Sequence, residues 1–178
     1  MGTHLIPGAD ANTRSIIESI RRVVRGLRMY SRAAEKSVGL SGAQLFVLQK
    51  LAAGRAMSLN ELAERTLTHQ SSVSVVVQRL VDKGFVKRLP SRKDKRRVEL
   101  SLTNEGNALL EKSPGAAQDR LIYALRRMPD TRRRLLSSLL EQLVQDTGLA
   151  DETPSLFFED DSPVIAIEVN RKNKKVKK

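Results

Sequence analysis

The chain has 178 residues and a formal net charge of +12, because 32 Lys and Arg residues outnumber 20 Asp and Glu residues. This excess favours a polyanionic partner, and nucleic acid fits better than a membrane because no apolar run approaches the ~20 residues of a spanning helix. The absence of cysteine excludes disulfides, Cys-ligated zinc and thiol redox chemistry, and an aromatic content of only 3% disfavours a single-strand binder that stacks bases.

The first predicted helix follows an N-terminal extension, residues 1–12, that shows no secretory signal, so we expect a cytoplasmic protein. The helix covers residues 13–38, is capped by Asn12 or Thr13, and ends at Gly39, which suits a left-handed C-cap. Its apolar residues recur at three- and four-residue steps and form one stripe: Ile16, Ile20, Val23, Val24, Leu27, Tyr30 and Ala34.

Two capping boxes predict the next two helices. Ser41 precedes Gln44 by three residues, and Ser58 precedes Glu61 by three residues. In this spacing the serine oxygen accepts from a free amide, and the longer side chain reaches back to the first residue's amide. Gly54 is expected to end the first of these two helices.

A third helix follows a short turn and is predicted from Thr68 to Gly84. Its valines are poor helix formers, so the segment could be taken for a strand. The boundaries and the three- and four-residue spacing favour a helix. The residues expected on its buried side are Val73, Val76, Val77, Leu80 and Val81.

A charged hairpin comes next, with strands Phe85–Leu89 and Val98–Leu102 and a tip that begins at Pro90. Seven of the eleven residues 87–97 are cations, and Asp94 is the single anion among them. This concentration of charge beside two helices suits the phosphate backbone of a duplex.

The chain after the hairpin is predicted to be helical up to residue 147. Thr103 caps the first helix, Pro114–Gly115 kinks or interrupts it, and Pro129 begins the last helix. The last helix carries a second apolar stripe: Leu135, Leu136, Leu139, Leu140, Leu143 and Val144.

Residues 148–178 are expected to form a tail rather than a domain. The tail is acidic over 151–161, contains a short apolar stretch at Val164–Val169, and ends with six cations in 171–178. Two interpretations stay open: a solvated extension that aids solubility, and a supplementary phosphate contact.

The second helix of a helix-turn-helix enters the major groove, and its exposed side chains face base edges. Glutamine can pair with adenine, serine can donate or accept, and valine can contact a thymine methyl group. The alternative is an ordinary polar solvent face. The candidate DNA-contacting residues on this helix are His69, Gln70, Ser71, Ser74, Val75, Gln78 and Arg79.

The hairpin supplies the remaining DNA-contacting candidates. Asp94 and Arg96 stand two apart, so in extended backbone the carboxylate shares a face with the guanidinium and can orient it toward a narrow minor groove. The alternative is a solvated charged turn. The candidates in this segment are Lys87, Arg88, Arg92, Lys93, Asp94, Lys95 and Arg96.

The order of these elements resembles the multiple-antibiotic-resistance regulator (MarR) family. Two stretches carry the resemblance: Leu80-Val-Asp-Lys-Gly84-Phe-Val-Lys-Arg88, and Ser91-Arg-Lys-Asp94-Lys-Arg96-Arg-Val-Glu-Leu-Ser-Leu-Thr103 followed by Asn-Glu-Gly106. It covers about residues 13–147 and implies a homodimer, joined by N- and C-terminal helices, on a pseudo-palindromic promoter site. It also implies repression relieved by a small ligand, often an aromatic or phenolic anion.

The sequence departs from the family pattern at three places. Val75 stands where the family often has a basic residue, Ser91 replaces a frequent acidic residue, and the tail beyond 148 is not typical. If an effector pocket exists, we expect it where the dimerisation helices meet the DNA-binding lobe. Its candidate residues, each also explicable as ordinary core or as a solvated charge, are Leu27, Arg28, Tyr30, Leu45 and Leu109.

The expected fold is mainly α (α+β), a winged helix-turn-helix. The DNA-binding lobe covers about 41–103, and the dimerisation helices cover 13–38 and 104–147. No nucleophile–base pair, phosphate loop or metal cluster is visible, so we expect no enzyme and no cofactor. The leading hypothesis is a transcriptional regulator. The alternative is a winged-helix module that binds protein through its basic hairpin, and salt dependence separates the two.

Overall fold

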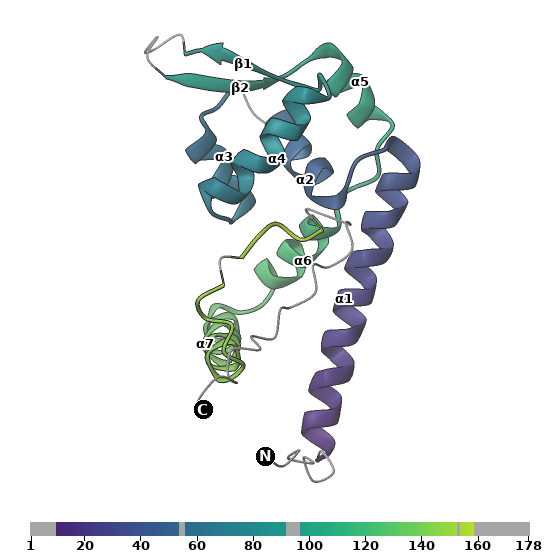
Figure 1. The fold of residues 1–178 in the computed structure, drawn as a ribbon. Helices are drawn as coiled ribbons and strands as arrows, with labels where there is room; N and C mark the ends of the chain where they lie inside the picture. The colour runs from purple at the N-terminus through teal and green to yellow at the C-terminus, as the bar shows by residue number, and fades with distance from the viewer. Residues whose placement is uncertain (1–9, 54–55, 92–96, 153, 159–178) are drawn as a thin grey trace, which may run out of the picture.

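The computed structural model describes residues 10–53, 56–91, 97–152 and 154–158. Within these ranges a lobe of short helices and one hairpin stands on a long helix and an angled pair of helices (Figure 1). The elements are α1 Ala11–Val38, α2 Gly42–Ala52, α3 Leu59–Thr66, α4 Gln70–Asp82, β1 Val86–Pro90, β2 Val98–Leu102, α5 Asn104–Glu111, α6 Ala117–Arg126 and α7 Asp130–Asp146. The fold is therefore mainly helical with a winged hairpin, as the sequence predicts.

The core of the lobe is built on α2, which is buried on almost every side. Leu45, Phe46 and Leu48 are at most 1% exposed, and they pack against the apolar side of α4. Helix α2 is surrounded because α1, α3, α4, α5, α6 and β2 all contact it. A helix with apolar residues on most of its sides is stable only in such a central position.

Both predicted capping boxes are confirmed. The Gln44 amide donates to Ser41 Oγ over 3.2 Å, and the Ser41 amide donates to Gln44 Oε1 over 3.3 Å. The Glu61 amide donates to Ser58 Oγ over 3.2 Å, and the Ser58 amide donates to Glu61 Oε2 over 2.7 Å. These caps set the starts of α2 and α3.

The start of α1 differs from the prediction. The cap is Asp10 rather than Asn12 or Thr13, and its Oδ1 accepts from the amides of both residues over 2.8 and 2.9 Å. The bonds from Thr13 hold the pKa of the Asp10 carboxyl below its ordinary value. The other end is as predicted, since Gly39 adopts a left-handed conformation with φ 69°.

The start of α4 also differs, because Thr68 does not cap it. Leu67 adopts the left-handed region at φ 55°, and the Thr68 amide donates to the carbonyl of Ala63 over 3.1 Å. Thr68 therefore belongs to the C-terminal end of α3. His69 is the N-cap, and α4 begins at Gln70.

The hairpin pairs Val86 with Leu102 and Pro90 with Val98 in antiparallel register. Its first strand begins one residue later than predicted, because the Phe85 amide donates to the carbonyl of Leu80 and completes the end of α4. Pro90 lies in the strand rather than in the tip. A bridge between Met57 and Leu100 joins the chain before α3 to the hairpin.

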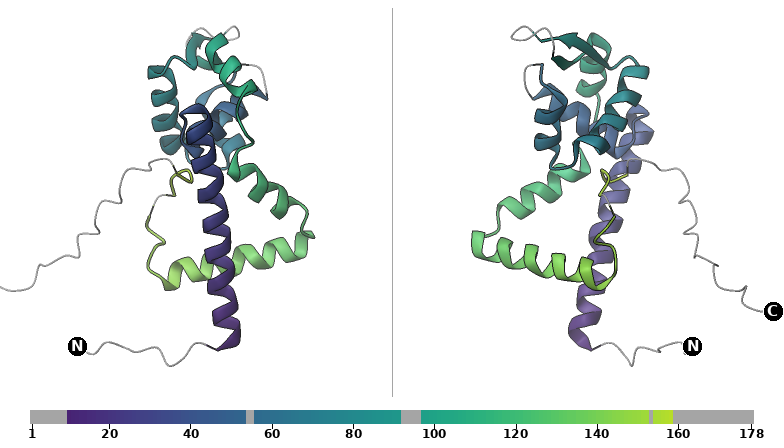
Figure 2. Two further views of the ribbon diagram at one scale, coloured as in Figure 1. Left: turned by 90° about the vertical axis from the view of Figure 1, so that its right-hand side faces the viewer. Right: turned by 60° about the vertical axis from the view of Figure 1, so that its left-hand side comes forward.

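The predicted interruption at Pro114–Gly115 separates α5 from α6, and Pro129 is the N-cap of α7 rather than its first residue. Figure 2 shows α6 leaving the lobe and α7 turning at an angle to it. Within the described part of this single chain, none of the residues of α7 is buried.

Candidate nucleic-acid interface

Helix α4 has one face in the core and the opposite face in solvent. Val73, Val76, Val77 and Leu80 are fully buried, and they fix the rotation of the helix. The predicted contact residues lie on the other side. Five of them are exposed: His69, Gln70, Ser71, Val75 and Gln78. The other two, Ser74 and Arg79, are half-buried.

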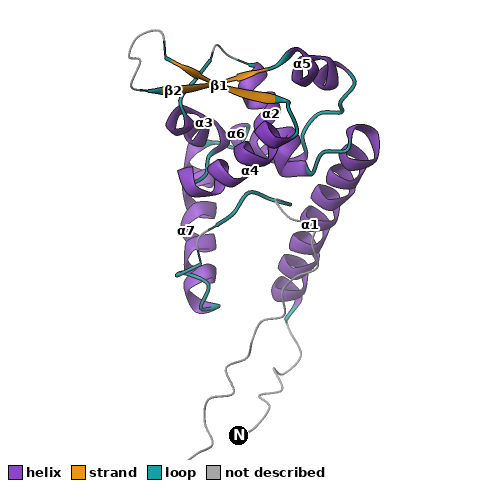
Figure 3. Ribbon diagram, turned by 45° about the horizontal axis from the view of Figure 1, so that its top comes forward, coloured by secondary structure: helices purple, strands orange, loops and turns teal. Residues whose placement is uncertain are grey.

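The hairpin lies beside α4, and its first strand contacts that helix (Figure 3). Lys87 and Arg88 are both exposed on β1. Arg88 Nη2 donates to Gln78 Oε1 over 2.9 Å, and Gln78 Nε2 donates to Asp82 Oδ1 over 2.8 Å. Gln78 therefore links the helix to the wing, a contact that the sequence pattern does not reveal.

The base of the wing is closed by Ser91, the residue at which the sequence departs from the family pattern. The Ser91 amide donates to the carbonyl of Arg97 over 2.8 Å, and its hydroxyl donates to Glu99 over 2.6 Å. Serine thus supplies a cross-strand bond here. The candidates Arg92, Lys93, Asp94, Lys95 and Arg96 lie outside the described residues, so the Asp94–Arg96 arrangement stays a prediction.

The five effector-site candidates do not meet in one described cavity. Leu45 is fully buried, and Leu27 is 7% exposed, so both serve the protein interior. Leu109 lines a shallow hollow between α1 and α5, and Arg28 lines another hollow along α1. Tyr30 instead pairs with Arg120 of α6.

The Tyr30–Arg120 pair joins two helices that are far apart in sequence. The Arg120 guanidinium lies 4.1 Å from the ring centroid of Tyr30, and its Nη1 donates to the phenol oxygen over 2.7 Å. This geometry combines a cation–π contact with a hydrogen bond. Tyr30 therefore holds α6 against α1.

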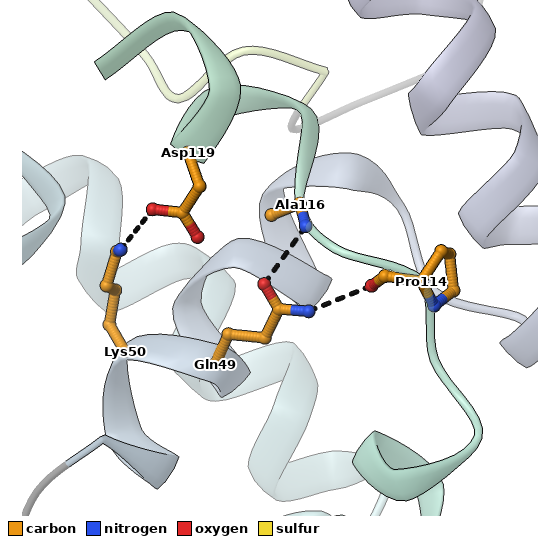
Figure 4. Close-up of polar contacts among 5 residues, drawn as sticks. All are labelled: Gln49, Lys50, Pro114, Ala116 and Asp119. Carbon is orange, nitrogen blue, oxygen red and sulfur yellow. Dashed lines mark hydrogen bonds and ion pairs between the residues drawn. The ribbon is translucent and has the colours of Figure 1, made fainter. Parts of the chain in front are cut away.

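A second junction ties α6 to the lobe (Figure 4). Gln49 Nε2 donates to the carbonyl of Pro114 over 2.9 Å, and the Ala116 amide donates to Gln49 Oε1 over 3.1 Å. Lys50 forms an ion pair with Asp119. These partners are 65 to 69 residues apart, so no local pattern identifies them.

The described ranges hold no group of three His, Cys, Asp or Glu side chains that could bind a metal ion. Across the same residues, no helix combines the length and apolar character needed to cross a membrane. The described surface of this part of the lobe combines the polar face of α4 with the exposed cations Lys87 and Arg88 of β1.

Similar proteins and a family model connect the chain with transcriptional regulators. A family model for the MarR family matches residues 38–97. The chain is 38% identical to the HTH-type transcriptional repressor MdtR of Bacillus subtilis over 73 residues, which are 41% of this chain and about half, 47%, of that repressor. It is 32% identical over 147 residues to the uncharacterised HTH-type transcriptional regulator ML2140 of Mycobacterium leprae, covering 82% of this chain and 98% of the relative.

The fold is similar to that of Sco3205, a MarR family transcriptional regulator of Streptomyces coelicolor solved in complex with DNA. The TM-score is 0.54 at 21% identity, over 81% of this chain and 92% of that one. The family model and the nearly full-length match to the mycobacterial regulator show that the chain belongs to the MarR family of DNA-binding transcriptional regulators, and it is not an enzyme.

Proposed function

We propose that the chain is a homodimeric, effector-responsive repressor that binds a pseudo-palindromic operator in double-stranded DNA within the cytoplasm. The observation that supports this most directly is the pair of apolar stripes on α1 and α7, which are exposed in the part of the chain that the structure describes. Repression rather than activation is supported by the relative MdtR, which is named a repressor.

The two stripes are large and exposed in the single chain. On α1, Ile16 and Val23 are 56% and 47% exposed, and on α7 Leu135 and Leu139 are 61% and 55% exposed. Burying such a side chain from full exposure stabilises by about 1.5–3 kcal/mol, and since these are already about half-buried, each would contribute about half of that. A second copy with the same stripes would bury them across a two-fold axis. The lobe cannot do so, because α1 and α7 project away from it (Figure 1).

A two-fold dimer presents two recognition helices to one face of the duplex. In such dimers the helices enter successive major grooves, roughly 34–36 Å apart. Gln70, Ser71 and Ser74 stand near the N-terminal end of α4 and would read bases. Lys87 and Arg88 would contact phosphates, because they lie exposed on the adjacent strand. Within the wing tip, Arg96 oriented by Asp94 is proposed to enter the minor groove.

The effector is proposed to be a small aromatic or anionic compound that acts where the dimerisation helices meet the lobe. Arg28 and Leu109 remain candidates for contact with it, since both line surface hollows. Leu27 and Leu45 are proposed only as interior support for such a site.

Assembly is tested by sedimentation equilibrium at micromolar concentration. Leu139→Glu places a charge on the α7 stripe and should convert a dimer into a monomer, whereas the matched control Ser138→Glu lies on the opposite side of α7 and should remain dimeric. A wild-type monomer, or a dimeric Leu139→Glu variant, would contradict the proposed interface.

Base reading is tested by selecting preferred sites from randomised duplexes. Ser74→Ala should relax the preferred sequence, whereas Lys87→Ala should weaken all duplexes about equally, because phosphates carry no sequence information. If Gln70→Ala and Ser74→Ala both return the wild-type site, the assignment of base contacts to this helix face is wrong.

A further inference from the structure

The described chain after α7 turns back and runs to the base of the lobe (Figure 1). Its segment 154–158 lies within the acidic stretch 151–161 and belongs to the tail that is not typical of the family. Leu156 is only 4% exposed and is part of the same core cluster as the buried residues of α2 and α4. This segment is therefore packed against the lobe and is not simply a solvated extension.

The segment contacts the lobe at both of its ends. Ser72 Oγ of α4 donates to the carbonyl of Pro154 over 3.3 Å. The ring of Phe158 lies next to Gly42, where an added Cβ would stand 3.6 Å from Cδ2 of that ring. Between them Leu156 points inward, whereas Phe157 is 50% exposed. The segment thus touches α4 at one end and the start of α2 at the other.

The contact falls on the part of α4 that has the least support of its own. In the described structure the N-cap His69 makes no side-chain hydrogen bond to the first turn. Ser72 is the third residue of the helix and is 8% exposed, with Ser71 exposed on the other side. An uncapped helix end is held mainly by what packs against it.

We propose that Leu156 is a positioning residue for DNA recognition: together with the Ser72–Pro154 hydrogen bond, it holds the first turn of α4 in the conformation that reads bases. This inference rests on the proposed role of that turn in base reading. The proposed role requires no contact between this segment and DNA. It acts through Ser72, which is adjacent to the base-reading residue Ser71.

The test compares full-length variants by fluorescence anisotropy on two duplexes, the site selected by the wild type and a scrambled site. Leu156→Asp should lose about 10-fold in affinity for the selected site with little change on the scrambled site, because phosphate contacts do not depend on the first turn. The conservative variant Leu156→Met should keep the wild-type ratio of affinity for the selected site to affinity for the scrambled site. The matched control Phe157→Asp adds the same charge at an exposed neighbour and should leave the ratio unchanged.

Hydrogen exchange supplies a readout that does not depend on DNA. In Leu156→Asp the amide of Val73, which donates to the carbonyl of His69 over 3.2 Å, should exchange faster, while that of Leu48 in α2 should not. If that variant does not fold, Leu156→Ala carries both measurements.

The inference is overturned if Leu156→Asp has the same ratio of affinities for the two duplexes as the wild type. It is also overturned if amide hydrogen exchange in that variant rises equally in α2 and α4. A wild type that does not distinguish the two duplexes overturns base reading instead, and with it the positioning role.

Discussion

Gly106 offers a sharp test of how the wing is attached to α5. This glycine is buried in the first turn of α5, and a Cβ built on it would lie 2.3 Å from the carbonyl oxygen of Phe85. That oxygen already accepts a hydrogen bond from the Thr103 amide over 3.0 Å, and the Gly106 amide donates to Thr103 Oγ1 over 3.0 Å. Gly106→Ala therefore forces two backbone segments apart at the root of the hairpin.

The magnitude follows from the distance. Cβ contacts below 3.0 Å essentially do not occur, so the carbonyl must move by about 0.7 Å, the difference between 3.0 and 2.3 Å. Overpacking costs typically about 1–3 kcal/mol, and the upper end applies because a backbone carbonyl cannot rotate away. Alanine returns about 1 kcal/mol of helix propensity. The net destabilisation is expected to be about 2 kcal/mol, or roughly 4–8 °C in Tm for a chain of this size.

The assay is thermal unfolding followed by circular dichroism at one fixed protein concentration, since the proposed dimer would make Tm depend on concentration. Gly26→Ala is the matched control. Gly26 also lies within a helix, but nothing stands within 4 Å of an added Cβ, so this variant should be as stable as the wild type or more stable. If Gly106→Ala is as stable as Gly26→Ala, then α5 does not lie so close to the Phe85 carbonyl that a Cβ is excluded, and the reasoning is refuted.

Three further predictions concern the α6 junction, the wing tip and the tail. Gln49→Leu leaves the Ala116 amide and the Pro114 carbonyl without their partner, so chemical denaturation should show a loss of about 1–3 kcal/mol; unchanged stability would mean that water replaces the side chain. Arg96→Ala should weaken specific duplex binding by about 1–3 kcal/mol with Tm unchanged, and Asp94→Ala should lose part of the same energy; wild-type anisotropy titrations for Arg96→Ala would exclude the minor-groove contact. Deleting residues 170–178 should make the slope of log affinity against log salt shallower for every duplex without altering the preferred site; an unchanged slope means that these cations do not contact DNA.

The features that sequence predicts well are those decided by a few neighbouring residues. The capping boxes at Ser41 and Ser58 and the left-handed Gly39 are local, so their residue types are sufficient to place them. The rotation of α4 also follows from its apolar spacing, because only one face can enter the core. Those same features place Gln70 and Ser71 on the exposed side.

The errors arise where a residue adopts an uncommon conformation or where the partner is distant. Leu67 takes a left-handed conformation that leucine rarely adopts, so Thr68 resembles a helix cap but ends α3. The Gln49–Pro114 and Tyr30–Arg120 contacts join helices that only the folded chain brings together. For the same reason the sequence does not reveal that Tyr30 pairs with Arg120 or that Leu45 lies in the core, and their role at an effector site stays a prediction.

The stability of α4 depends on its surroundings more than on its own sequence. Five of its thirteen residues are valine, each about 0.5 kcal/mol less favourable in a helix than alanine, and its first turn has no side-chain cap. Three contacts compensate: the buried valines in the core, Gln78 with Arg88 of the wing, and Ser72 with Pro154 of the C-terminal segment. Ser74 and Val75 lie between Ser72 and Gln78, and Gln70 and Ser71 directly precede Ser72. A change in either of the last two contacts is therefore expected to alter the surface that α4 presents. If α4 reads bases as proposed, Arg88 on β1 and the chain beyond α7 modulate that recognition through their contacts with α4.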